Sequence, residues 1–336
     1  MTEVQIPRSF KGKRVLVVGG TGLIGSPLSK MLLEEEGAVV RIVSKDDASR
    51  AHPKAEFKKL DLLEPKNCLE ACKDMEYVFS LFGVKGSPKM TTQRPATFFD
   101  NTILVSMQLL KAVHLTGVAG YLYTSSVGAY PPAEVFKEEN LWSGPPSPND
   151  EFAGIAKRIG EIQGKAHKIE YGFDDFTTVY PCNVYGPLDN FDSENAMVVP
   201  SLIKKALIAF ESGRPLIAWG DGSPIRDFIH AKDVARGMLI AAKNGPGRSY
   251  NLGTGVGVSI KQLTDIIVKN LPGPIEVRWD TSAPSGDSKR IMDISRIRSI
   301  GFEQKISLDE GIRDTINWYL KNRSETGKRF DAFDTV

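Results

Sequence analysis

Residues 14–25 read RVLVVGGTGLIG, and this stretch decides the fold. The mostly apolar run Arg14–Val18 predicts a strand, and Leu23–Glu36 follows it with the spacing of an amphipathic helix. The turn between them contains Gly20-x-Gly22-x-x-Gly25. In this context the glycines let the backbone approach a pyrophosphate, and the helix N-terminus offers it free N–H groups. A dinucleotide is therefore expected to contact Gly19, Gly22, Leu23, Ile24 and Gly25.

The same alternation of strand and helix continues through the first half of the chain. Further strands are expected at Val39–Val43, Phe57–Leu60, Tyr77–Phe82, Gly120–Thr124 and Phe176–Tyr180, with helices at Asn67–Lys73, Phe98–Thr116 and Gly154–Tyr171. The strands are almost wholly apolar, as strands covered on both faces are. Alternating strands and helices imply right-handed crossovers and a parallel sheet. The sequence predicts an α/β protein with a Rossmann-type, doubly wound parallel sheet.

Beyond Asn183 the alternation loosens. Loops rich in Gly, Pro, Asp and Asn separate helices expected at Val198–Glu211, Asp233–Ala242 and Leu308–Lys321. We predict a dinucleotide-binding domain at residues 1–183 and, at 184–330, a smaller mixed α/β lobe that binds substrate. The chain is free to cross back between the two lobes. The polar tail from Asn322 to Val336 is expected to fray.

Composition excludes several classes of protein. The 336 residues are 41% hydrophobic and 25% charged, which is typical of a globular chain. A net charge of +2 gives no field that would attract nucleic acid or an anionic membrane. Three cysteines, no signal sequence and no run of about 18 apolar residues predict a cytoplasmic protein. Cys68 and Cys72 lack further Cys or His at metal-ligand spacing, so no metal site is predicted.

The end of the second strand bears on the choice of dinucleotide. In place of the carboxylate that binds a ribose 2′-hydroxyl, this strand ends in Ser44–Lys45. A small hydroxyl beside a cation favours the 2′-phosphate of NADP, but Asp46–Asp47 follow at once and keep NAD open. Asp61, with Leu62 beside it, closes the third strand and is expected at the adenine end. The alternative is a turn carboxylate that caps the next helix.

Several motifs occur in one order along the chain. They are GGTGLIG at 19–25, TSSVGAYP at 124–131, AGIAKRIGE at 153–161, PCNVYGP at 181–187, WGDGSPIRDFIHAKDVA at 219–235 and SKRIMD at 288–293. Together they resemble the NAD-dependent epimerase/dehydratase family, which comprises extended short-chain dehydrogenases/reductases that act on nucleotide sugars. Within it, the segments at 186–191, 195–200 and 219–228 resemble the GDP-L-fucose synthase subfamily. The resemblance implies a tightly bound NAD or NADP, contacted also by Lys157 and Pro181.

In this family the chemistry depends on a Ser or Thr, a Tyr, and a Lys four residues after the Tyr on the same helical face. The lysine holds the cofactor ribose and lowers the pKa of the tyrosine, whose phenolate takes the sugar's proton as hydride leaves. The resemblance assigns the lysine to Lys157 and the serine to Ser126. At the position of the tyrosine, however, stands Ala153, which has no proton to exchange.

Other groups are candidates for the missing base. Tyr130 and Tyr185 belong to loops expected at the carboxyl ends of strands, where such folds bind ligands. The alternative is that each stacks on the ligand as a rim residue. Glu151, or a water held by Lys157, is a weaker candidate. The groups of fucose synthases that epimerise two further carbons are also missing, because Gly128 or Val127 replaces the Cys and Met197 replaces the His.

The resemblance also implies a site for a nucleotide-diphosphate sugar, where a cluster of cations would match the diphosphate. Its residues would be Asn183, Asn195, Lys205, Trp219, Arg226 and Arg290. We therefore expect an NAD(P)-dependent oxidoreductase, either a dehydrogenase/reductase or an epimerase, that acts at C4 of a nucleotide-linked, GDP-type sugar. The alternative is a catalytically impaired relative that only binds. A homodimer is expected, through a four-helix interface made by Phe98–Thr116 and Gly154–Tyr171.

Overall fold

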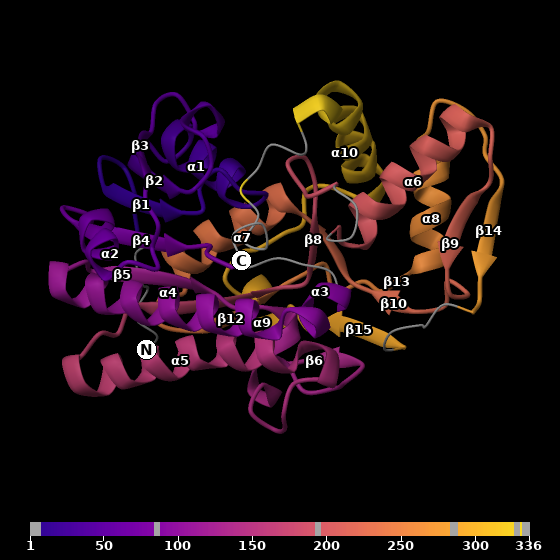
Figure 1. The fold of residues 1–336 in the computed structure, drawn as a ribbon. Coiled ribbons are helices and arrows are strands. Elements are labelled where there is room, and N and C mark those ends of the chain that lie inside the picture. The colour runs from indigo at the N-terminus through magenta and orange to yellow at the C-terminus, as the bar shows by residue number, and fades with distance from the viewer. Residues whose placement is uncertain (1–7, 84–87, 192–195, 283–287, 326–329, 331–336) are drawn as a thin grey trace.

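The computed structural model describes residues 8–83, 88–191, 196–282, 288–325 and 330 (Figure 1). Within these residues a parallel sheet of seven strands has the order β12-β7-β5-β4-β1-β2-β3. Its strands are β1 (Arg14–Val18), β2 (Val39–Ser44), β3 (Glu56–Lys59), β4 (Tyr77–Ser80), β5 (Gly120–Thr124), β7 (Phe176–Pro181) and β12 (Ser249–Leu252). This is the predicted doubly wound fold, and strand order reverses beside β1.

Helices cover both faces of the central sheet, as alternate residues of β1 show. Val15 and Val17 pack in one core with side chains of α1 (Gly25–Glu34) and α7 (Ala231–Asn244). Leu16 and Val18 pack in a second core with α2 (Pro65–Cys72) and α4 (Pro95–Thr116). On that second face, α5 (Glu151–Tyr171) lies against α4, and its glycines meet Tyr123 and Phe176. Side chains that alternate between two cores are expected of a strand covered on both sides.

The chain crosses back to the first lobe after residue 183. Helix α7 packs on α1, and β12 pairs with β7 at the edge of the central sheet. The sequence did not predict β12, because Ser249–Leu252 is short and half polar. Neighbouring β8 (Asn183–Tyr185) and β11 (Phe228–His230) form a separate parallel pair that leads from one lobe to the other.

The smaller lobe has a core of its own (Figure 1, orange and yellow). Its helices are α6 (Val198–Ser212), α8 (Ile260–Lys269) and α10 (Leu308–Asn322), and its parallel pair consists of β9 (Leu216–Trp219) and β14 (Val277–Asp280). A mixed sheet joins the lobes in the order β13 (Val258–Ser259), β10 (Ile225–Arg226), β15 (Lys289–Met292) and β6 (Val135–Phe136). The short helices α3 (Pro88–Gln93) and α9 (Ser295–Arg298) complete the set. None of the described helices is long and apolar enough to cross a membrane.

Candidate active site

The glycine-rich turn after β1 forms a cradle that side chains would fill. Gly19 has φ of +74°, a conformation that favours glycine. A Cβ on Gly25 would lie 2.1 Å from the carbonyl oxygen of Gly19, and a Cβ on Gly22 would lie 3.1 Å from the same oxygen. Helix α1 therefore begins pressed against the turn, with Leu23 and Ile24 half-buried beside it. This backbone fits a pyrophosphate held at the helix N-terminus.

Hydrogen-bonded side chains join this turn to the ends of β2 and β3. The Thr21 hydroxyl donates to Oδ2 of Asp46 and lies 2.8 Å from Oγ of Ser44. Lys45 donates to Oδ2 of Asp61 at 2.8 Å. Burial alone would raise the pKa of Asp61, but hydrogen bonds from Lys45 and a backbone amide outweigh it and lower the pKa. The predicted adenosine-end residues thus lie together, and the buried side chain of Leu62 follows them.

Lys157 is buried at the carboxyl edge of the sheet. Its Nζ donates to the carbonyl oxygens of Phe82 and Thr124, each at 2.9 Å, directly after β4 and at the end of β5. Burial lowers the pKa of Lys157 to about 8. An ammonium has three donors, and these carbonyls take two. Among the described residues the third donor has no hydrogen-bond acceptor, so it is available to a ligand.

Two hydroxyl groups at the end of β5 have hydrogen-bonding capacity that the described residues do not use. Oγ of Ser126 accepts the backbone N–H of Gly128 at 3.1 Å and so starts a short helical turn. The hydroxyls of Thr124 and Ser125 are buried and have no hydrogen-bond partner within the described part of the chain. An unpaired buried polar group costs about 1–3 kcal/mol, so a bound polar group would stabilise this edge. Together with Lys157, these hydroxyls fit the ribose and nicotinamide end of a dinucleotide.

The position at which the family has its tyrosine lies in the first turn of α5 and is occupied by Ala153. Ala153 is half-buried there, four residues before Lys157. The helix packs closely on the loop after β5, because a Cβ on Gly154 would lie 2.3 Å from the carbonyl oxygen of Gly128. A Cβ on Gly128 would lie 3.0 Å from Oδ1 of Asp150. A carboxylate therefore occupies the space that a cysteine at position 128 would need.

The two candidate substitutes for the base are buried. The hydroxyl of Tyr130 donates to Oδ1 of Asn251 at 2.6 Å, inside the first core. Tyr185 is 1% exposed and packs edge-on against His230 in the core of the smaller lobe. Burial raises the pKa of both phenols above their usual range. Neither lies at the rim and neither ionises near neutral pH, so this geometry removes both from the candidate bases.

Two arginines lie side by side at the junction of the lobes. Arg226 and Arg290 are register partners on the parallel strands β10 and β15, which places their side chains on one face. Nη1 of Arg226 donates to the carbonyl of Ile225 at 2.8 Å. Arg290 donates to Oδ2 of Asp150 and Oγ of Ser147, both at 2.8 Å. Arg290 thus connects the smaller lobe to the loop that precedes α5, through a contact with Asp150 that the sequence analysis did not predict.

The other predicted substrate residues lie in or beside the smaller lobe. Nζ of Lys205 lies 4.4 Å from the ring centroid of Trp219, which is 67% exposed, and burial lowers the pKa of this lysine. Asn183 is half-buried and donates to the carbonyl of Asp227 at 2.8 Å. Pro181 is buried at the end of β7. Asn195 lies outside the described residues.

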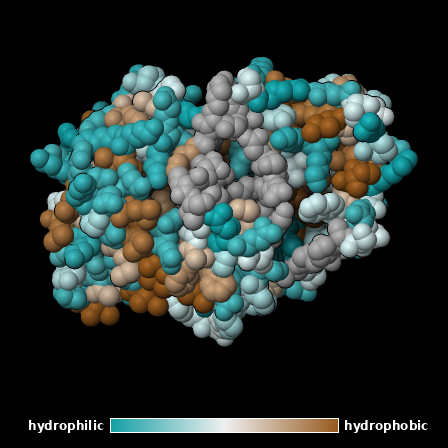
Figure 2. Space-filling model, in the orientation of Figure 1, coloured by the Kyte–Doolittle hydropathy of each residue, from teal (hydrophilic) through white to brown (hydrophobic). Residues whose placement is uncertain are grey.

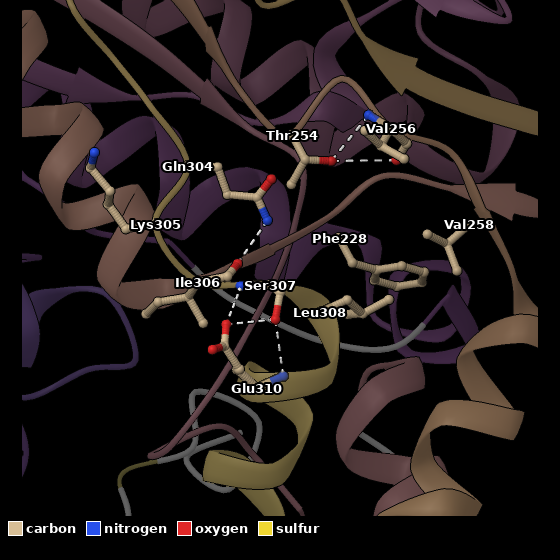
Figure 3. A pocket seen from close by; sticks show the side chains of 10 residues that line it. All are labelled: Phe228, Thr254, Val256, Val258, Gln304, Lys305, Ile306, Ser307, Leu308 and Glu310. Atoms are coloured by element: carbon tan, nitrogen blue, oxygen red, sulfur yellow. Dashed lines mark hydrogen bonds between the residues drawn. The ribbon is translucent and has the colours of Figure 1, made fainter.

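A separate pocket of about 410 Å³ lies between the loop after β12 and the segment before α10 (Figure 3). Polar side chains that line it form hydrogen bonds within the segment around the start of α10. Ser307 Oγ donates to Oε2 of Glu310 and accepts the Glu310 backbone N–H, which caps α10, while Gln304 donates to the carbonyl of Ile306. The lining includes none of the predicted site residues, so we do not take this pocket as the active site.

The fold and this edge of the sheet define a nucleotide-binding oxidoreductase of the extended Rossmann class. Residues 15–253 match the NAD dependent epimerase/dehydratase family, so the chain belongs to that family and is an enzyme with a nicotinamide cofactor. The match includes the glycine-rich turn, Ser126 and Lys157.

Curated relatives and a solved structure agree with this assignment. The "Probable GDP-L-fucose synthase 1" of Oryza sativa subsp. japonica is 31% identical over 319 residues, covering 93% of each chain. The GDP-L-fucose synthase of Escherichia coli is 28% identical over 326 residues, covering 93% of this chain and 98% of its own. The UDP-N-acetylglucosamine 4-epimerase of Methanobrevibacter ruminantium, solved with UDP-N-acetylmuramic acid, is 26% identical with a TM-score of 0.80, covering 93% of this chain and 99% of its own.

Proposed function

We propose that this enzyme oxidises or reduces C4 of a nucleotide-diphosphate sugar, GDP-linked by its similarity to fucose synthases, with NAD or NADP tightly held. The observation that carries the proposal is Lys157, which keeps a proton-exchanging group at the carboxyl edge of β4 and β5 although Ala153 replaces the tyrosine. A group with a pKa of about 8 exchanges protons readily near neutral pH.

In the proposed mechanism each residue has one task. A nicotinamide held beside Lys157 at the carboxyl edge of β4 and β5 would supply the hydride chemistry at C4 of the sugar. Ser126 holds the C4 oxygen, and Lys157 supplies the proton that this oxygen needs when the ketone is reduced, or accepts it in the reverse direction. A water in the space beside Ala153 relays the proton between Nζ and the sugar oxygen. Lys157 then exchanges its proton with solvent, so the cycle balances without a phenol.

The arginine pair supports a diphosphate substrate. Arg226 and Arg290 on neighbouring strands present two guanidinium groups on one face, and a fork of N–H donors matches the oxygens of a diphosphate. Lys205 and Trp219, which already lie against each other, would take the nucleotide base and its ribose. Arg290 also contacts Asp150 before α5, so an occupied diphosphate site would be linked directly to the helix that carries Lys157.

The second candidate is a relative that binds both ligands without turnover, which Ala153 favours. Turnover separates the two. Purified enzyme is incubated with the 4-hydroxy and 4-keto forms of GDP- and UDP-linked sugars, and the reduced nicotinamide is followed by its absorbance. Hydride transfer with a GDP-linked sugar supports the proposal. Cofactor that stays bound through purification, with neither hydride transfer to or from any of these sugars nor epimerisation of them at C4, would establish the binding protein instead.

The surface of α4 and α5 supports the proposed homodimer. Figure 2 shows apolar side chains gathered at the lower left, over these two helices of Figure 1. Exposed apolar residues there include Leu104, Met107, Phe152, Ile162 and Ile169. Two helices that pack on each other and expose an apolar face match half of a four-helix interface, because a symmetric dimer presents the same patch twice.

A further inference from the structure

A residue near the C-terminus contacts the adenosine end of the cofactor site. The backbone N–H of Phe330 donates to Oδ1 of Asp46 at 3.0 Å, across 284 positions of sequence. The ring of Phe330 lies with its centroid 4.2 Å from Nζ of Lys45. The polar tail was expected to fray, so this contact corrects that expectation at Phe330.

The two residues that Phe330 contacts are those that join the cofactor-binding elements. Oδ2 of Asp46 accepts the Thr21 hydroxyl of the glycine-rich turn. Lys45 donates to Asp61 at the end of β3. Phe330 therefore acts on the turn, on the end of β2 and on the end of β3 through the side chains that connect them.

The charges at this place bear on the cofactor's 2′ position. Lys45 contributes one positive charge, while Asp46 and Asp61 contribute two negative charges, so these three groups sum to −1. A 2′-phosphate carries about −1.5 to −2 at pH 7 and would be repelled by the carboxylates of Asp46 and Asp61, while one of the three donors of Lys45 is already bound to Asp61. The ring of Phe330 lies against the Lys45 ammonium and limits the directions from which a phosphate can approach it. A ribose 2′-hydroxyl meets neither obstacle.

We propose that Phe330 is a positioning residue that fixes Lys45 and Asp46 in this arrangement and so selects NAD over NADP. The inference rests on the proposed function only in that the site between β1, β2 and β3 holds the adenosine of the cofactor. Cofactor binding and docking of Phe330 then stabilise each other, since coupling between two binding events is reciprocal.

Direct titration of the apo protein with NAD and with NADP tests the proposal. Wild type is expected to bind NAD more tightly than NADP. Phe330→Ala removes the cation–ring contact and is expected to weaken NAD binding about tenfold, within the range of such contacts when partly desolvated, and to narrow the preference for NAD. A chain ended after Phe330 keeps the residue and serves as the matched control, with both affinities unchanged.

A second readout follows the tail itself. Lys328 and Arg329 are trypsin cleavage sites directly before Phe330. NAD and ADP-ribose are expected to slow cleavage there in wild type and to leave it unchanged in Phe330→Ala. Equal thermal unfolding of the two apo proteins shows that the variant is folded, and Phe330→Tyr, which keeps a ring over Lys45, is expected to retain NAD affinity.

The outcomes separate the inference from the proposed function. A wild type that binds neither dinucleotide would refute the proposed function. Normal NAD binding with no change in Phe330→Ala, or tighter binding of NADP than of NAD by wild type, would overturn the role of Phe330 and leave the proposed function standing.

Discussion

Replacing Lys157 by methionine tests the proposed proton carrier most directly. Methionine has nearly the length of the lysine stem and no charge, so it fills the same buried space without Nζ. The variant loses the hydrogen bonds to the carbonyl oxygens of Phe82 and Thr124, and it loses the third donor toward the ligand. Loss of a general acid or base typically slows turnover by about 10²–10⁴-fold. We expect Lys157→Met to lower kcat within that range.

The proposed role of Lys157 predicts opposite pH dependences for the rates of reduction and oxidation. Burial lowers the pKa of Lys157 to about 8, and the protonated form is the one that donates in reduction. Reduction should therefore proceed at a constant rate below pH 8 and slow as pH rises through 8. In the oxidation direction the neutral amine is the active form, so the rate should rise through the same pH. Lys157→Met should lose this inflection in both directions.

The assay follows reduced nicotinamide by absorbance at saturating cofactor and sugar, from pH 6 to 10. Lys165→Met is the matched control, because Lys165 is an exposed lysine on the same helix whose Nζ lies 5.0 Å from the ring of Trp142. It should retain wild-type activity and the inflection. A Lys157→Met variant with more than a tenth of wild-type kcat, or a wild-type profile that is flat between pH 7 and 9, would refute the reasoning.

Further predictions concern the missing phenol, the diphosphate site, the dimer and the stability of the helix. Because the proposed relay water occupies the space beside Ala153, Ala153→Tyr should displace it and lower kcat in the same assay; a rise of about 10²-fold or more would show instead that no working proton carrier acts there. Arg226→Ala should weaken nucleotide-sugar binding by about 1–3 kcal/mol in calorimetry and leave cofactor affinity unchanged. Ile162→Glu, at an exposed apolar residue of α5, should give monomers in sedimentation at micromolar concentration, where a monomeric wild type would exclude the dimer. Burial raises the pKa of Glu161 from 4.5 to about 7, so its contribution to stability is full below pH 4.5 and lost as pH rises through 7; thermal unfolding of Glu161→Gln should lack this loss.

The strands that could be predicted are the buried strands that consist mostly of apolar residues. Arg14–Val18 is covered on both faces, and its last four residues are all Val or Leu, so its pattern sufficed to find it. Ser249–Leu252 is also buried, but it carries Asn251 in the core. The amide of Asn251 is satisfied by the Tyr130 hydroxyl and by carbonyls of Phe136 and Asp293, all far away in sequence. The local sequence pattern therefore cannot predict that Asn251 is buried with these hydrogen-bond partners.

The same limit explains which parts of the site were predicted. The glycine-rich turn and the Lys157 position are local motifs, and the structure brings both to one edge of the sheet. The role of Tyr130 depended on where its ring points, and that direction is set by Asn251 at a distance of 121 residues. Phe330 and Asp46 are separated by even more residues, 284, and no sequence motif predicts their contact. Spacing predicts contacts within one element, whereas burial of a loop side chain depends on the whole fold.

The loss of the tyrosine need not remove the chemistry, because the tyrosine and the lysine contribute differently. Positioning of the sugar and cofactor lowers the barrier by several kcal/mol on its own, and Ser126, Lys157 and the arginine pair still provide it. In the family the lysine also lowers the pKa of the catalytic tyrosine, and it cannot do so here because Ala153 replaces that tyrosine. Yet burial lowers the pKa of Lys157 itself to about 8, which supports the proposal that its ammonium donates the proton through a water. Under this proposal we expect slow turnover, which would favour a cofactor that stays bound between cycles.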